Sequence, residues 1–316
     1  MSMVSLDLAP MNVLSFDVEE HWRIEAAAHL QLDQGRKNYY AGRVEEPTLW
    51  LLEQLARFEQ KATFFVVGQL ARAQPGLVRA MHAAGHEVAS HGWDHRRIHA
   101  LTPEAFRDDV LKSKDTLEQI LGEPIIGYRA PTFSVVRQTG WALDVLAEEG
   151  FAYDSSVYPV RHDRYGVPEA PRGPFLAGGE SLKILELPPA RLDLWGVQLP
   201  MGGGGYFRLL PLALMDLALE QSVCDQWPPV AVTYFHPWEF DRDQQRLPLS
   251  KFSQFRTYVG IERSRPRLVQ LLRRHRFVRA QDVLAALTPV LDRLPCYRVA
   301  EVHAPAPCLR DLAIVH

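Results

Sequence analysis

The regular order of short apolar runs and helical patterns constrains the fold of this chain more than any other feature. Runs such as 61–68 (KATFFVVG) and 86–90 (HEVAS) are each followed by a segment whose apolar residues recur at helical spacing. Thr102 and Pro103 add a capping residue and a first-turn proline to one such helix. We expect strands at 13–16, 61–68, 86–90, 125–130, 151–156, 182–187 and 230–237, and helices at 47–60, 75–85, 102–122 and 141–150.

Such alternation predicts parallel strands covered by helices. About seven parallel strands favour an α/β fold of the (β/α)7-8 TIM-like type, a distorted and incomplete barrel, over an open doubly wound sheet. No strand is followed by a G-x-G-x-x-G or Walker loop, and we interpret the glycine run 202–205 as a surface turn. We expect a barrel domain over 1–288 and a C-terminal extension packing on it over 289–316.

Composition narrows the class of protein. A net charge of -3 over 316 residues lacks the basic surplus of a nucleic-acid binder. Cys224, Cys296 and Cys308 are odd in number and form no C-x-x-C pair, so they favour a reducing compartment over a disulfide framework. The start, 1–10, lacks the features of a signal peptide, and we expect a cytoplasmic protein.

The most apolar helical stretch, 209–220, is too short to cross a bilayer and is interrupted by Pro211 and Asp216. No membrane span is therefore expected, while association with a membrane surface stays open. The sequence does not predict an oligomeric state.

Titratable residues follow five of the expected strands. They are Asp17 and Glu19, His91 and His95, Arg129, Asp154, and His236. In parallel barrels the catalytic residues come from the carboxyl ends of the strands, so these side chains are candidates for one site.

Two histidines and a carboxylate are a frequent ligand set for a catalytic divalent ion. His91 and His95 can point to one side if their segment begins a helical turn, and Glu19 could supply the oxygen ligand. An H-x-x-x-H pair alone is often two solvated histidines, and His95 with His99 repeats the spacing. The position directly after an expected strand favours His91 and His95.

The other strand-end groups each allow two interpretations. Asp17 could act as a general base or cap a helix. Arg129 could hold a carboxylate ionised or lie at the surface. His236 could donate a proton to a leaving amine or pack in the core, and Asp154 could tune His236 or cap a helix.

Taken in order, these residues resemble the polysaccharide deacetylase family, the carbohydrate esterases with a NodB homology domain. The resemblance covers roughly 11–239 and rests on five motifs: 17–19 (DVE), 90–95 (SHGWDH), 129–131 (RAP), 154–156 (DSS) and His236. It implies Asp17 as base, Glu19, His91 and His95 as metal ligands, and His236 as acid.

DVEEHW, GGGYFRLLP and YFHPWEFD are similar to the branch found with exopolysaccharide and exosortase gene clusters. Three positions depart from the family pattern. Glu19 stands where aspartate is commoner and Glu20 is adjacent, so either glutamate could be the ligand. Gly92 replaces a bracing Ser or Thr, and the backbone N–H assigned to the oxyanion hole belongs to Thr132.

The resemblance implies a metal-dependent amide hydrolase that removes an N-acetyl or other small acyl group from an amino sugar in a polysaccharide or its nucleotide- or lipid-linked precursor. One divalent ion is expected, zinc before cobalt, nickel or manganese. Trp22, Trp93, Tyr206 and Trp238 are candidates for stacking on the sugar, although core packing is the commoner role of such aromatics. The alternatives are an allantoinase-like or deformylase amidohydrolase of the same fold, and a catalytically silent carbohydrate-binding barrel.

Overall fold

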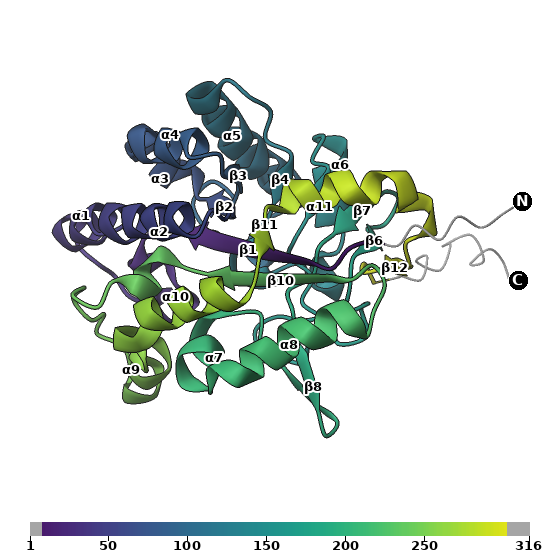
Figure 1. The fold of residues 1–316 in the computed structure, drawn as a ribbon. Coiled ribbons are helices and arrows are strands. Elements are labelled where there is room, and N and C mark those ends of the chain that lie inside the picture. The colour runs from purple at the N-terminus through teal and green to yellow at the C-terminus, as the bar shows by residue number, and fades with distance from the viewer. Residues whose placement is uncertain (1–7, 302–316) are drawn as a thin grey trace, which may run out of the picture.

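Parallel pairing dominates the central sheet, as the strand–helix alternation predicts. In the computed structural model, which describes residues 8–301, the sheet runs in the order β10-β1-β2-β3-β4-β5-β7-β6-β12, and β11 also pairs with β1. Among these described strands, β6 and β7 make the one antiparallel pair of the sheet. Figure 1 shows the helices arranged around the outside of the curled sheet.

The strands are β1 (Met11–Val18), β2 (Thr63–Val66), β3 (Glu87–Ser90), β4 (Gly127–Tyr128), β5 (Tyr153–Asp154), β6 (Phe175–Gly178), β7 (Lys183–Glu186), β10 (Val230–Phe235), β11 (Phe277–Val278) and β12 (Cys296–Arg298), with a separate hairpin of β8 (Leu192–Leu194) and β9 (Val197–Leu199). The helices are α1 (Gln34–Gly42), α2 (Glu45–Arg57), α3 (Gly68–Ala73), α4 (Pro75–Ala83), α5 (Pro103–Leu121), α6 (Ala142–Glu148), α7 (Gly204–Leu209), α8 (Leu212–Cys224), α9 (Lys251–Tyr258), α10 (Ser264–Arg274) and α11 (Ala280–Leu287).

The barrel closes through irregular backbone between β7 and β10. Ala190 N–H donates to Val232 O at 2.8 Å, and Tyr234 N–H donates to Gly202 O at 2.8 Å. The gap between the two strands is therefore bridged without a regular strand, and the prediction of a distorted, incomplete barrel is confirmed.

The glycine run 202–205 is not a surface turn. Gly202 and Gly203 are buried, and a Cβ on Gly203 would lie 1.6 Å from the carbonyl oxygen of Tyr234. Glycine is needed because the chain passes directly against β10. The end of the run begins α7.

Local signals set several helix boundaries. Thr102 caps α5 by accepting a hydrogen bond from Ala105 N–H at 3.2 Å. Pro211 does not interrupt a helix but caps α8, where it needs no N–H. Asp216 lies inside α8 and pairs with Arg274 at 2.6 Å. Among the described residues, no helix is both long and apolar enough to span a membrane.

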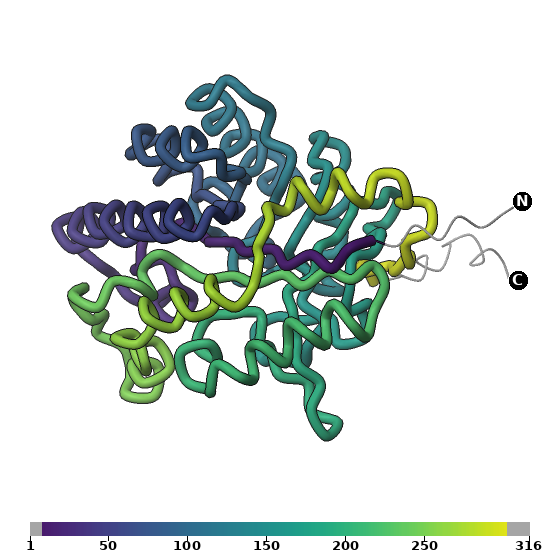
Figure 2. The backbone as a smooth tube through the Cα atoms, viewed as in Figure 1, coloured from purple at the N-terminus to yellow at the C-terminus, as the bar shows by residue number. Residues whose placement is uncertain are grey.

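The C-terminal part of the chain returns to the sheet. Figure 2 follows it past β1, with which β11 pairs in parallel, to β12, which pairs with β6. The expected extension 289–316 thus adds a strand to the sheet over its described part, and a domain boundary at 288 stays a prediction. Residues 302–316, with Cys308, lie outside the described residues.

Candidate active site

Three side chains that the sequence singled out as metal ligands lie together at the carboxyl ends of β1 and β3. One ligand atom from each of Glu19, His91 and His95 lies within 4.8 Å of the others. The histidines do not share a helical turn as expected. Instead, left-handed backbone at Gly92 (φ 73°) and His95 (φ 62°) folds the loop so that both rings reach Glu19.

The imidazole of His91 is held in one orientation. Its Nδ1 lies 2.8 Å from Arg129 O, so Nδ1 carries the proton and Nε2 is left as the ligand atom. Burial lowers the pKa of His91 to about 4, which keeps the ring in the neutral form that a metal needs.

Glu19, and not Glu20, faces these histidines. Glu20 pairs with Arg23, whose Nε lies 2.5 Å from its Oε2. Glu19 Oε2 lies 2.5 Å from His95 Nε2, yet it is buried and has no hydrogen-bond partner of acceptable geometry among the described residues. Burial disfavours its charge, but His95 and the other nearby histidines hold the pKa of Glu19 well below its usual value. An ionised, buried oxygen without a donor, beside two imidazole nitrogens, fits a divalent cation.

The loop of His91 has a brace in place of the hydroxyl that Gly92 lacks. Asp109 Oδ2 accepts the Trp93 N–H at 2.8 Å, and Ser90 Oγ accepts the Gly92 N–H at 3.3 Å. A Cβ on Gly92 would lie 3.0 Å from Asp109 Oδ2, so the departure from the family pattern is matched by close packing. His99 is exposed and takes no part in the cluster.

Asp17 is fixed beside the ligand cluster by a buried arginine. Arg129 Nη1 donates to Asp17 Oδ1 at 2.7 Å and to Ser15 Oγ at 2.8 Å, while its Nη2 donates to Ser155 Oγ at 2.8 Å. This bond uses one carboxylate oxygen, and Asp17 Oδ2 lies 4.0 Å from His236 Nε2. The second oxygen can therefore accept a proton within the site.

His236 follows β10 and presents Nε2 to the same space. Its Nε2 lies 3.8 Å from Glu19 Oε1, and its Nδ1 lies 2.8 Å from Glu239 Oε1. Burial alone would lower the pKa of His236, but the hydrogen bond to Glu239 and the charges of Glu19 and Asp17 raise it to about 9. The raised pKa favours the protonated ring, the form that can donate a proton from Nε2.

The carboxylate that contacts His236 is Glu239, and not Asp154 as expected. Asp154 Oδ1 accepts a hydrogen bond from Ser156 Oγ at 2.5 Å, and its strand register places it opposite Glu186. Burial raises the pKa of Asp154 to about 6 and that of Glu186 well above its usual value. Asp154 therefore belongs to a buried carboxyl pair with Glu186.

Thr132 has backbone of an unusual kind. Its φ is 57°, a left-handed value that is costly for a β-branched residue. Such backbone persists where the surroundings impose it, often at active sites. Thr132 lines a cavity together with Trp238, whose Nε1 lies 3.4 Å from Glu19 Oε1.

The four candidate sugar-stacking aromatics separate into two pairs. Tyr206 and Trp238 line a cavity of about 370 Å³ that also contains Thr132. Trp93 lies away from it, with its ring against Arg72 of α3 and Lys112 of α5. Trp22 packs against Arg23 and Lys37. Trp93 and Trp22 do not line this cavity, and the stacking role stays a prediction.

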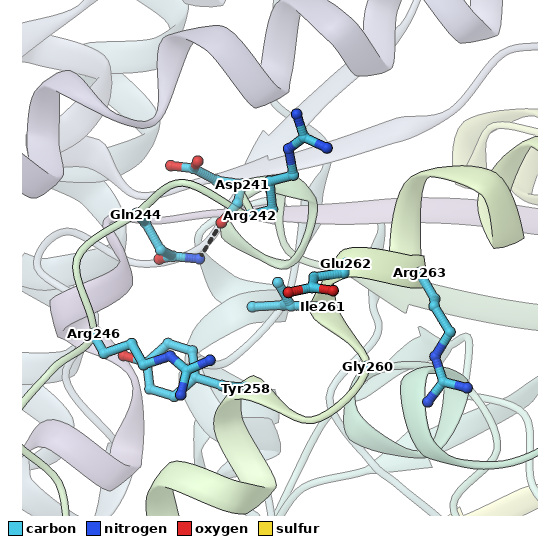
Figure 3. Close-up of a pocket in the computed structure, with 9 residues that line it drawn as sticks. All are labelled: Asp241, Arg242, Gln244, Arg246, Tyr258, Gly260, Ile261, Glu262 and Arg263. Atoms are coloured by element: carbon cyan, nitrogen blue, oxygen red, sulfur yellow. Dashed lines mark hydrogen bonds between the residues drawn. The ribbon is translucent and has the colours of Figure 1, made fainter.

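A second hollow, of about 290 Å³, lies between residues 241–246 and 258–263. Figure 3 shows that the guanidinium groups of Arg242 and Arg263 point in different directions, and that Arg246 lies over Tyr258. Because its charged groups do not converge, we place no site there.

Sequence reasoning missed two residues at the site. Glu239 could have been found, because it follows His236 at a spacing of three in HPWE. Arg208 donates to Glu239 Oε2 at 2.7 Å, but it comes from α7, and no local pattern connects it with His236.

Two family models match adjacent parts of the chain. One, described as "Polysaccharide deacetylase", matches residues 27–152, and one described as "Domain of unknown function (DUF3473)" matches residues 155–285. The first contains the His91 and Arg129 motifs, while Asp17 and Glu19 precede it. The second contains His236.

Similar proteins point the same way. A peptidoglycan deacetylase of Helicobacter pylori is 30% identical over 125 residues, which cover 40% of this chain and 41% of that protein. A chitooligosaccharide deacetylase of a Bradyrhizobium strain is 30% identical over 34% of this chain and 47% of that protein. The chain thus spans less than half the length of these two curated relatives.

Solved structures extend the likeness in fold to nearly the whole chain. One from Mycobacterium smegmatis, provisionally assigned to the polysaccharide deacetylases, aligns over 96% of this chain and 97% of that chain, with a TM-score of 0.60 and 19% identity. The motifs and the fold agree with the match of residues 27–152 to the polysaccharide deacetylase model.

Proposed function

We propose that this protein is a metal-dependent amide hydrolase that removes an N-acetyl group, or another small acyl group, from an amino sugar. One observation carries the proposal: a carboxylate, Asp17, and an imidazole, His236, lie together beside Glu19, which forms with His91 and His95 a group that could hold a metal ion. Asp17 Oδ2 and Glu19 Oε1 lie 4.0 and 3.8 Å from His236 Nε2. Amide hydrolysis needs a base and an acid in this arrangement, since water must lose a proton and the amine must gain one.

The ion would be held by Glu19, His91 and His95, and zinc is the ion we propose, because two histidines and one carboxylate are a common catalytic zinc set. When bound, such an ion supplies Lewis acidity, which makes water a nucleophile near neutral pH and polarises the carbonyl.

The protein's own residues carry out the proton transfers. Asp17 accepts a proton from the attacking water at Oδ2 while Arg129 holds Oδ1. The Thr132 N–H donates to the developing oxyanion. His236 then protonates the leaving nitrogen from Nε2, and without that proton the amine is a poor leaving group.

The amino-sugar substrate rests on two further observations. The cavity that Thr132 lines also has aromatic groups in its wall, among them Tyr206, which can stack on a pyranose ring, whereas Trp238 is already stacked against His21 and His236. The curated relatives are named for deacetylation of peptidoglycan and chitooligosaccharides. We propose a glycan or glycan precursor as the substrate class, with an exopolysaccharide as the favoured member.

A release assay tests the proposal. Purified protein is stripped of metal, reloaded with Zn²⁺, and incubated with N-acetylated chitooligosaccharides, with peptidoglycan fragments, with an N-formyl amino sugar and with allantoin. We expect metal-dependent release of acetate. Formate release alone, or allantoin hydrolysis, would instead support the other amidohydrolases of this fold. Full metal content with no hydrolysis of any of these compounds, but with measurable binding of the oligosaccharide, would support a silent carbohydrate-binding barrel.

A further inference from the structure

We propose that Glu239, held by Arg208, is the positioning residue of the proton donor His236, so that the segment matched to a domain of unknown function supplies the acid half of the active site. This inference rests on the proposed function, since it gives His236 the role of acid. It concerns which residues make that role possible.

The contact between Glu239 and His236 fixes both the ring and its tautomer. Glu239 Oε1 accepts from the His236 backbone N–H at 3.1 Å and from the Nδ1–H at 2.8 Å. A proton held at Nδ1 leaves Nε2 as the nitrogen that faces Asp17 and Glu19. Trp238 lies over the ring with centroids 5.3 Å apart, which limits its tilt.

Glu239 is itself held in place by Arg208. The Nε of Arg208 donates to Glu239 Oε2 at 2.7 Å, and its Nη1 donates to Thr257 O at 2.6 Å and Val259 O at 3.0 Å. Both side chains are at most 2% exposed. A buried ion pair of this kind is weak support for stability, because desolvation offsets its attraction. Its clearest consequence here is the orientation of His236.

These contacting groups come from three separate parts of the segment 155–285: α7, the residues after β10, and the end of α9 with the residue that follows it. The polysaccharide deacetylase segment contributes none of them. The base has a comparable support on the other side, where Arg129 holds Asp17. Base and acid are thus each oriented through a buried arginine, and the two arginines belong to different segments.

The test compares two substrates with different leaving groups. An acetamido sugar needs a proton on its leaving amine, whereas an activated acetate ester, such as a nitrophenyl ester, needs much less help. We expect Glu239→Gln to lower kcat for the amide by at least about tenfold and for the ester by less than about threefold, with KM little changed. The loss should be smaller than the roughly 100-fold effect of removing an acid itself.

Two variants make the comparison specific. Glu262→Gln alters an exposed carboxylate in the same segment and should leave both rates unchanged. Asp154→Asn tests the rival assignment: an amide-selective loss with Asp154→Asn, and none with Glu239→Gln, would overturn the proposal. At a pH high enough to make the His236 ring neutral, its ¹⁵N shifts should show Nδ1 protonation in the wild type and a mixture of tautomers in Glu239→Gln.

The outcomes separate this inference from the proposed function. A wild-type protein that hydrolyses neither substrate contradicts the proposed function. An active wild type whose Glu239→Gln variant loses both rates equally, at unchanged metal content, contradicts the positioning role.

Should Glu239→Gln not fold, Arg208→Lys takes its place, since it keeps a cation beside Glu239 but loses the paired carbonyl contacts. The same amide-selective loss is then expected, and equal losses would again be contradictory.

Discussion

The two segments of this chain build opposite sides of one site by different means. Residues 27–152 follow a regular strand–helix repeat, and His91, His95 and Arg129 project from strand ends of that repeat. Residues 155–285 contain an antiparallel pair, a separate hairpin and long irregular backbone, and they place His236 through β10, which pairs with β1.

The two sides of the site also differ in how deeply their side chains are buried. Glu19, His91 and Asp17 are buried and fixed by the sheet, as a metal set and a base require. His236 is partly exposed, next to the cavity formed largely by residues 162–165, 203–209 and 253–259. On the proposed mechanism, β1 and the regular segment together provide the reactive centre, and the irregular segment provides the proton donor and most of the substrate-facing wall.

The metal side should respond most strongly to mutation. His91→Ala removes one of three ligands, and after dialysis we expect metal content to fall from about one ion per chain to near zero, with loss of activity on both amide and ester. His99→Ala, an exposed neighbour, is the control and should keep its metal. The metal content of the dialysed proteins tests the assignment. If His91→Ala kept its metal and His99→Ala lost it, His91 would not be a ligand and the metal site would include His99.

The base should come next. Asp17→Asn keeps the shape of the side chain and leaves Arg129 bonded to Ser15 and Ser155, so fold and metal content should survive. An amide cannot accept the proton from water, and we expect a loss on the order of 10³-fold on both substrates, measured by acetate release. A stable, metal-loaded Asp17→Asn protein with a near-normal rate would show that another group acts as base.

The acid side should discriminate between substrates. His236→Ala should lower hydrolysis of an acetamido sugar by on the order of 100-fold and that of an activated ester by much less, because only the amine requires protonation. Asp17→Asn, by contrast, should slow both substrates, so the two variants together distinguish the base side of the site from the acid side. Equal losses on amide and ester, at unchanged metal content, would assign His236 to binding or to the oxyanion.

The sequence predicted the regular segment far better than the irregular one. Each strand there is followed by a helix with its own period and boundary signals, such as Thr102 before α5. Beyond residue 155, the short β6, β8 and β9 lack a hydrophobic period of their own. Pro211 was interpreted as interrupting a helix over 209–220. A proline is tolerated at the start of a helix but not in its interior, and the sequence did not show that α8 begins directly after Pro211.

The site followed the same division. Strand-end position was enough to bring together Glu19, His91, Arg129 and His236, because parallel strands end at one rim. It could not predict the positive φ of His95, which depends on how the loop packs. Nor could it predict Arg208, whose contact with Glu239 exists only after α7 folds against the end of β10.

The smallest predicted effect is on the free energy of unfolding and not on catalysis, and it comes from His86. His86 precedes β3, and its Nδ1 accepts the Ala62 N–H at 3.2 Å, so the folded protein needs a neutral ring. Burial, with Lys61 and Arg279 nearby, lowers the pKa of His86 to about 4, against about 6.5 in an unfolded chain. Between these values the unfolded state binds a proton that the folded state does not, so stability is full above pH 6.5 and falls as the pH drops toward 4.

By pH 5 the loss attributable to this group should be about 2 kcal/mol. His86→Asn can still accept the Ala62 N–H but cannot titrate, so its free energy of unfolding, measured by urea titration, should fall less between pH 7 and pH 5 than that of the wild type. His82→Asn, with a side chain 36% exposed, is the matched control and should keep the wild-type slope. If His86→Asn also keeps that slope, the acid sensitivity of the folded protein originates elsewhere. In that case a neutral His86 would not be needed for β2 to pair with β3, the strand that His91 follows.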